Sequence, residues 1–298
     1  MKKKLTAVLL AATMLLTSGV TVFADRVDAV IDKPYLALGA DLTPQEQMTV
    51  LSLLGLEDIN VDDYDIISIT NADEHEYLDK YLDASIIGTR ALSSVLVVGK
   101  EAGNGINVTT KNISYCTEGM YRNALLTAGI EDADITVAGP FSISGTAALV
   151  GAIKAYETMT GEEIADENLD AANDELVLTG KLVEDIGDSE KAEDLMALVK
   201  QEVAENKLTS AEDIQNVVDQ ACDQLDIQLS EENQQQIAEL MKKIEGLDLD
   251  VDKLKDQAKD LYQKLEDLDF HVDKESVGNF FTRIIDAIVN FFQGLFGK

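Results

Sequence analysis

Cysteine and histidine are scarce in this chain, and their scarcity excludes the commonest metal and redox sites. Only Cys116 and Cys222 occur among 298 residues, and they form neither a CxxC redox motif nor a zinc-ligand pattern. In an oxidising compartment the two could form a disulfide, but Cys222 lies on the apolar face of an expected helix, where a buried free thiol fits equally well. With only His75 and His271 present, histidine chemistry is confined to two positions.

Basic residues are also few. The chain has 24 Lys and Arg against 56 Asp and Glu, a formal net charge of -32. The acidic excess is spread along both halves, which is typical of general solubility in an exported protein. Because nucleic-acid binding needs a cationic surface to neutralise phosphate, this composition argues against a nucleic-acid partner.

After residue 24 the chain lacks another apolar run of about 18 residues, so no transmembrane segment is expected in the mature protein. Residues 1–24 have the parts of a secretory signal peptide: lysines at 2–4, an apolar stretch at 5–22, and small residues before a cut that follows Ala24. We therefore expect a secreted, extracellular protein that can associate with the cell envelope.

The first half of the mature chain, residues 25–160, mixes expected helices and strands. Thr43, Pro44 and Glu46 have the spacing of a capping box, which predicts a helix ending near Gly55. The next expected elements are a strand at 66–70 and a helix capped by Asn71 that runs to Asp83. Strands at 91–98 and 106–115 follow, joined as a hairpin by the glycine-rich loop 99–105. The last three elements are a helix from Thr117 to Gly129, a strand at 134–139 and a helix from Gly145 to Met159. This is the order of the split βαβ, or ferredoxin-like, plan.

Residues 161–298 contain no convincing strand, and their apolar residues recur at helical spacing. The stretch GLDLDVDK at 246–253 resembles the start of an EF-hand loop, but Lys253 and Lys259 stand where such a loop needs Gly and Glu. Related stretches occur upstream and downstream, so we interpret it as a repeated helix connector whose Asp or Ser caps the next helix. No metal site is expected. The fold class is therefore α+β, with a split βαβ domain followed by an all-α bundle or helical hairpins; a long coiled coil is the alternative.

Several runs between residues 38 and 157 are distinctive. They are LGADLT at 38–43, ITNADEH at 69–75, IGTRALSS at 87–94, TEGMYRNAL at 117–125 and PFSISGTAAL at 140–149. Together they resemble the YpuA-like family of secreted proteins from Gram-positive bacteria, domain of unknown function 1002. The resemblance implies an extracytoplasmic, envelope-side protein, and it supplies no catalytic residues.

The run Asp73-Glu74-His75 is the first candidate for chemistry. These side chains offer acid–base groups, and histidine changes charge near neutral pH. In the alternative interpretation Asn71 caps the helix, and the two acidic residues interact favourably with the helix dipole. Because neighbouring residues diverge by about 100° around a helix, the three cannot all face one substrate.

The second candidate follows an expected strand and opens a helix. Here Ser142, Ser144, Gly145 and Thr146, together with Asn71, are candidates for binding a small anion or another ligand, since helix N-termini attract anions. Ser144 could instead be a nucleophile with His75 as its base, or a helix cap among small residues that allow close packing. The run matches neither G-x-S-x-G nor a phosphate-binding glycine loop, and no cofactor is expected.

The last segment, residues 274–298, is expected to form a strongly amphipathic helix. Its apolar face is rich in phenylalanine and includes Phe280, Phe281, Ile284, Ile288, Phe291, Phe292 and Phe296. Such a helix can dock to a membrane surface or a partner. Burial against the other helices is the alternative.

Two functions follow as hypotheses. One is a non-enzymatic binding module whose partner is a cell-envelope component: the membrane surface, a wall polymer or a protein. The other is a hydrolase that acts on an envelope polymer, with Asp73, Glu74, His75 and Ser144 around a cleft. A helical domain organised by calcium is a third hypothesis.

Overall fold

The structure is a computed structural model and describes residues 33–57, 60–101, 103–161, 163–247, 249–252 and 254. Its strands are β1 (Tyr35–Gly39), β2 (Asp65–Ile69), β3 (Ser94–Gly99), β4 (Ile106–Ile113) and β5 (Ala133–Ile143). Its helices are α1 (Pro44–Leu53), α2 (Asn71–Leu78), α3 (Ala84–Ile87), α4 (Glu118–Thr127), α5 (Thr146–Thr160), α6 (Asp166–Ile186), α7 (Ser189–Asn206), α8 (Ala211–Leu225) and α9 (Glu231–Glu245), with a 3-10 turn η1 (Val61–Asp63). The expected signal peptide and the expected C-terminal helix lie outside the described residues.

The strands form one mixed sheet in the order β2-β1-β3-β5-β4. Strands β1 and β2 are parallel, as are β4 and β5, whereas β3 runs antiparallel to both β1 and β5. The expected mixture of helices and strands is confirmed, but the ferredoxin-like strand order is wrong. Strand β1 was not predicted, and it lies between β2 and β3.

The hairpin expected between β3 and β4 is also wrong, because β5 lies between these two strands. The glycine-rich loop that connects them is held by a residue distant in sequence. The carboxylate of Asp132, just before β5, accepts hydrogen bonds from the amides of Gly103 (3.0 Å) and Gly105 (2.7 Å). The loop therefore wraps around the start of β5 and does not turn β4 back onto β3.

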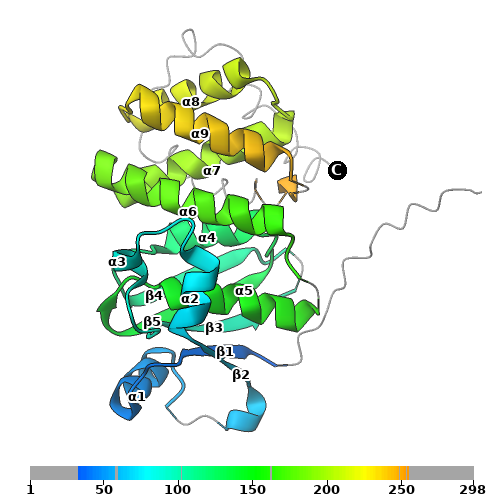
Figure 1. The fold of residues 1–298 in the computed structure, drawn as a ribbon. Helices are drawn as coiled ribbons and strands as arrows, with labels where there is room; N and C mark the ends of the chain where they lie inside the picture. The colour runs from blue at the N-terminus through cyan, green and yellow to red at the C-terminus, as the bar shows by residue number, and fades with distance from the viewer. Residues whose placement is uncertain are drawn as a thin grey trace, which may run out of the picture.

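Helices cover both faces of the sheet, as Figure 1 shows. Helix α5 packs on β1, β2 and β3, and α4 packs on β4, so these two helices cover one face. Helix α1 covers part of the other face, where Val50 and Leu54 form a small core with Leu36 and Ala138. The larger core lies between the sheet and the α4–α5 layer.

Local signals at several helix starts are confirmed. Thr43 and Glu46 form the predicted capping box of α1, and the hydroxyl of Thr117 accepts from the amide of Met120 at the start of α4. For α2, the predicted N-cap is one residue too far along the chain. Thr70, not Asn71, is the N-cap, and Asp73 completes its capping box.

Every regular element described after α5 is a helix, and successive helices pack on one another: α6 on α7, α7 on α8, and α8 on α9. Ser230 caps α9, as the repeated connector predicts, since its hydroxyl accepts from the amide of Asn233. In the next connector Asp252 was the expected cap, but Asp250 occupies the capping position two residues earlier, since its carboxylate accepts from the amide of Asp252 (2.9 Å). The described helices therefore fold back on one another as hairpins.

Helix α6 joins the two halves of the described chain. Ala172 and Leu176 belong to the core under the sheet, whereas Ala171 and Leu182 belong to the core of the helices that follow. Figure 1 shows α6 lying between α4 and the layers of α7, α8 and α9. The two cysteines are free and buried, each in a different one of these cores.

Candidate functional site

A cleft of about 470 Å³ opens beside the N-terminal end of α5, and we call it the α5 cleft. Its walls come from α2, α3, the loop before β3, the residues after β4 and the end of β5. Hydroxyl side chains dominate its polar lining: Ser85, Thr89, Ser93, Ser114, Tyr115, Ser144 and Thr146. Its apolar lining is supplied by Ile86, Ile87, Leu92, Phe141 and Ile143, and its charged residues are Glu74 and Arg90. The volume is in the usual range for small-ligand sites.

The carboxyl group of Glu74 forms the buried base of the α5 cleft. Only 1% of the residue is exposed, and its two oxygens accept from the hydroxyl of Thr146 (2.6 Å) and the side-chain amide of Asn71 (3.1 Å). Burial raises the pKa of Glu74, and these two hydrogen bonds oppose that rise. Because Glu74 contacts the first residue of α5, it occupies the place at this helix N-terminus where an anionic group of a ligand would otherwise be favoured.

The start of α5 is built around Gly145. This glycine is the N-cap, with a left-handed backbone (φ 99°), and its carbonyl accepts from the hydroxyl of Tyr121 (2.5 Å). The hydroxyl of Ser93 accepts from the amide of Ala148 (2.9 Å) and so caps the helix from another segment. Ser144 is therefore not the cap. Its hydroxyl lies 3.3 Å from that of Thr146 and faces the cleft.

Asp73 and His75 do not line the α5 cleft. The carboxylate of Asp73 accepts from the Lys154 ammonium (2.5 Å) and from the Thr70 hydroxyl (2.5 Å), and these bonds, Lys154 first, lower its pKa to about 2. The Nδ1 atom of His75 lies 2.5 Å from a carboxylate oxygen of Asp79, a hydrogen bond that raises the pKa of the imidazole. Both side chains thus have structural partners, and neither is placed to activate Ser144.

The low pKa of Asp73 gives a testable pH dependence. Its value of about 2 in the folded chain lies below the ordinary 3.8, so the unfolded chain binds the proton more readily. The stability that Asp73 contributes is therefore present above about pH 4 and is lost as the pH falls toward 2. We expect the urea midpoint of Asp73→Asn to fall less steeply than that of wild type between pH 5 and pH 3. Asp83→Asn, at a cap without a side-chain hydrogen bond, is the control that should keep the wild-type slope.

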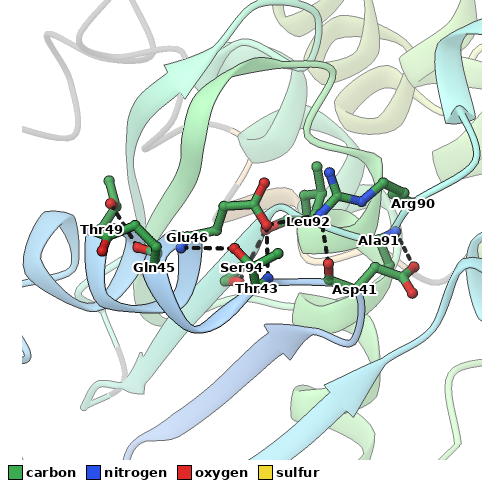
Figure 2. Close-up of polar contacts among 9 residues, drawn as sticks. All are labelled: Asp41, Thr43, Gln45, Glu46, Thr49, Arg90, Ala91, Leu92 and Ser94. Carbon is green, nitrogen blue, oxygen red and sulfur yellow. Dashed lines mark hydrogen bonds and ion pairs between the residues drawn. The ribbon is translucent and has the colours of Figure 1, made fainter.

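The loop that forms one wall of the cleft, residues 88–93, is fastened to the turn after β1 (Figure 2). A carboxylate oxygen of Asp41 accepts from the amide of Ala91 (2.8 Å). The guanidinium of Arg90 donates to the carbonyl of Asp41 (2.8 Å) and to the carboxylate of Glu46 (2.8 Å). The Thr43 amide, followed by Arg90, holds the pKa of Glu46 at about 2. The charge of Arg90 is therefore paired with the α1 capping box.

The residues predicted from sequence lie at different depths around the cleft. Glu74, Ser144 and Thr146 line it. Asn71 lies behind Glu74 and also donates to the carbonyl of Gly88 (3.4 Å). Gly145 is buried and supports the helix start, and Ser142 is exposed and is not part of the lining.

The opposite wall was not predicted from the sequence: Ser85, Thr89, Ser93 and the rim residue Phe141 were not proposed as site residues. One signal was available, because the distinctive run at 87–94 contains three of the lining hydroxyl and charged residues without forming a predicted helix cap or turn. Nothing in that run indicates its chemistry by itself. Contacts with residues distant in sequence bring it to the cleft, such as those with Asp41, about 50 positions earlier, and with Ala148.

The arrangement has little of what acid–base hydrolysis requires. Glycoside hydrolysis uses two carboxyl groups on either side of the bond, and the cleft lining contains one. Within the described ranges, no three His, Cys, Asp or Glu side chains gather in a way that could hold a metal ion. In the same ranges no helix has the length and apolar character needed to cross a membrane. The predicted docking residues, from Phe280 to Phe296, lie outside the described residues.

Comparison with known proteins gives one family. The model of a family described as "Protein of unknown function (DUF1002)" matches residues 38–261. The chain is also similar to a protein of Bacillus subtilis (strain 168) described as "Uncharacterized protein YpuA", with 39% identity over 299 residues that cover 98% of this chain and 100% of that protein. No solved structure matches the chain.

Proposed function

The chain belongs to the DUF1002 family, whose function is unknown, and from the geometry of the α5 cleft we propose that it is a non-enzymatic binding module of the cell envelope. In this proposal the cleft holds an extracellular ligand. The observation that carries it is the lining itself. Hydroxyl and apolar side chains converge there, and both charged groups have partners within the protein.

The distinctive sequence runs support this choice of site. The run at 87–94 and the run at 140–149 supply most of its walls, and the run at 69–75 supplies Glu74. The other two act as supports: Asp41 from the run at 38–43 fastens the wall loop, and Tyr121 from the run at 117–125 holds Gly145. Segments far apart in the sequence thus build one cleft, which favours a role for the cleft beyond packing.

The alternative is a hydrolase that acts on an envelope polymer. The observation that favours it is the burial that raises the pKa of Glu74, since a protonated carboxyl group can act as a general acid. Neither a second carboxyl group nor a base beside Ser144 accompanies it in the cleft lining. Release of soluble fragments from isolated envelopes by wild type, and its loss in Glu74→Gln, would support the hydrolase over the binding module.

The location of the protein is part of the proposal. It rests on the signal-peptide pattern in residues 1–24 and on the amphipathic face from Phe280 to Phe296, which we propose docks to a membrane surface or an envelope partner. Fractionation of producing cells into medium, wall and membrane should recover the intact protein with the envelope. A version ending at Val272 that stays folded should leave the membrane fraction, while its cleft can still hold it to the wall. Equal recovery of both versions in the medium would contradict the docking role.

The binding role is tested by obstructing the cleft. Ser85 is an exposed lining residue, so Ser85→Trp should fill the opening without disturbing the core. In a version ending at Val272, which lacks the docking face, we expect this variant to bind isolated envelopes of the producing cells at least about tenfold more weakly than the same version with Ser85 in a sedimentation assay. Ser142→Trp is the matched control: Ser142 is exposed, and it lies between two lining residues of a strand, so its side chain points the other way. Unchanged binding by Ser85→Trp would overturn the proposal.

A further inference from the structure

We infer that the ligand of the α5 cleft is a neutral glycan segment that carries acetamido groups. This inference rests on the binding role proposed above and names the chemical class that the lining fits. Three features support it: the pairing of both charged groups of the lining with partners within the protein, the predominance of hydroxyl groups, and the exposed aromatic ring at the rim.

The charges around the cleft distinguish among anionic, cationic and neutral envelope polymers as ligands. The net charge of -32 repels a polyanion such as a polyol phosphate. The cation in the cleft lining, Arg90, already donates to Glu46 and to the carbonyl of Asp41. An anionic ligand would have to share the guanidinium with these two acceptors. A cationic ligand would in turn have to compete for Glu74, whose oxygens accept from Thr146 and Asn71. A neutral ligand disturbs neither arrangement.

The hydroxyl groups fit a ligand of the same kind. A hydroxyl both donates and accepts, so it can pair with the hydroxyls of a sugar or with the N–H and C=O of an amide. Ser85 and Thr89 are exposed on one wall, and Ser144 lies on another. The cleft thus offers neutral hydrogen-bonding groups from more than one side.

The apolar side chains of the α5 cleft also fit an acetamido sugar. Phe141 is 49% exposed, and it is the aromatic member of the exposed large hydrophobic residues in the described chain, the others being Met48 and Ile66. An exposed aromatic ring beside hydroxyl groups suits a ligand with both a C–H face and polar edges. The C–H face of a pyranose ring can stack on Phe141, and an acetamido methyl group can contact Ile86 and Ile143 in the same cleft. A sugar without acetamido groups would leave this apolar wall uncovered.

The test uses N-acetylglucosamine tetramer as the probe and isothermal titration at about 0.3 M salt, which screens non-specific attraction of cations to the acidic surface. We expect wild type to bind the tetramer and Phe141→Ala to bind at least about tenfold more weakly, because the ring removes apolar surface from water on binding. Phe141→Trp should keep the affinity, and Ser142→Ala is the control for the same strand. Glucosamine tetramer, which lacks the acetyl groups, and polyglycerol phosphate should each bind at least about tenfold more weakly than the acetylated probe.

The possible results distinguish a wrong ligand class from a wrong binding role. Equal affinity of Phe141→Ala and wild type, or binding of the deacetylated or anionic polymer as tight as that of the acetylated one, overturns the ligand class. If the tetramer does not bind but envelope sedimentation remains sensitive to Ser85→Trp, the binding role stands and the ligand class is wrong. If neither the tetramer nor the envelopes bind, both are wrong.

Discussion

Lys200→Met is expected to destabilise the folded chain by about 3–5 kcal/mol, because it leaves a buried carboxylate without its cation. The ammonium of Lys200 is fully buried between α4, α6 and α7. It donates to the carboxylate of Glu175 (2.9 Å), to the hydroxyl of Thr127 (3.1 Å) and to the carbonyl of Asn123 (2.9 Å). Burial lowers the pKa of Lys200, and Glu175 opposes that change. This cluster ties the α4 layer to the helices that follow.

The double variant Lys200→Met/Glu175→Leu should recover most of the lost stability, because it removes both charges from the interior and fills the space with apolar atoms. Urea unfolding of the two single variants and the double variant completes the thermodynamic cycle. The neighbouring ion pair of Lys243 and Asp174 is the control. It is exposed, so Lys243→Met should cost less than about 1 kcal/mol. If Lys200→Met also costs less than about 1 kcal/mol, the buried cluster does not hold the α4 layer to the helices that follow.

Gly145→Ala is expected to have the second large effect, a loss of about 2–5 kcal/mol. A side chain at φ 99° costs about 1–2 kcal/mol in the left-handed region. In addition, a Cβ atom at this position would lie 2.7 Å from the hydroxyl oxygen of Tyr121 and 2.8 Å from a methyl carbon of Ile113, and such overpacking costs about 1–3 kcal/mol. The start of α5, and with it the floor of the cleft, should therefore shift.

The other end of the same helix provides the matched control. Gly161 has φ 70°, and a Cβ atom there would meet nothing within 4 Å. Gly161→Ala should therefore lose only the conformational part, about 1–2 kcal/mol. The difference between the two variants, measured by urea unfolding, isolates the cost of the close contacts with Tyr121 and Ile113. Equal losses would mean that the packing around Gly145 relaxes without cost.

Elements with local signals could be predicted from the sequence. The caps Thr43, Thr117 and Ser230 precede their helices by fixed spacings, and each makes the predicted hydrogen bond. Errors occurred where partners distant in sequence decide the structure. Asp132 holds the glycine-rich loop, and β5 enters between β3 and β4, so a stretch that looks like a hairpin is not one.

The same distinction applies to the cleft. Glu74, Ser144 and Thr146 were proposed as site residues because of their types and their places near helix starts. The residues that face them, such as Ser93 and Phe141, have no local signal of this kind. Ser93 reaches α5 because it caps Ala148, 55 residues later, and that contact depends on the complete sheet. The sequence therefore predicts one side of the cleft, and only the fold reveals the other.

Hydrogen exchange of the intact protein can show whether the α5 cleft binds an envelope ligand. Backbone exchange would be followed by mass spectrometry with and without wall fragments solubilised by a muramidase. We expect slower exchange in residues 85–93 and 143–147, where the cleft walls lie, with no change in α8 and α9. Binding of the fragments with protection confined to α8 and α9, or with no protection at the cleft walls, would contradict this role of the cleft.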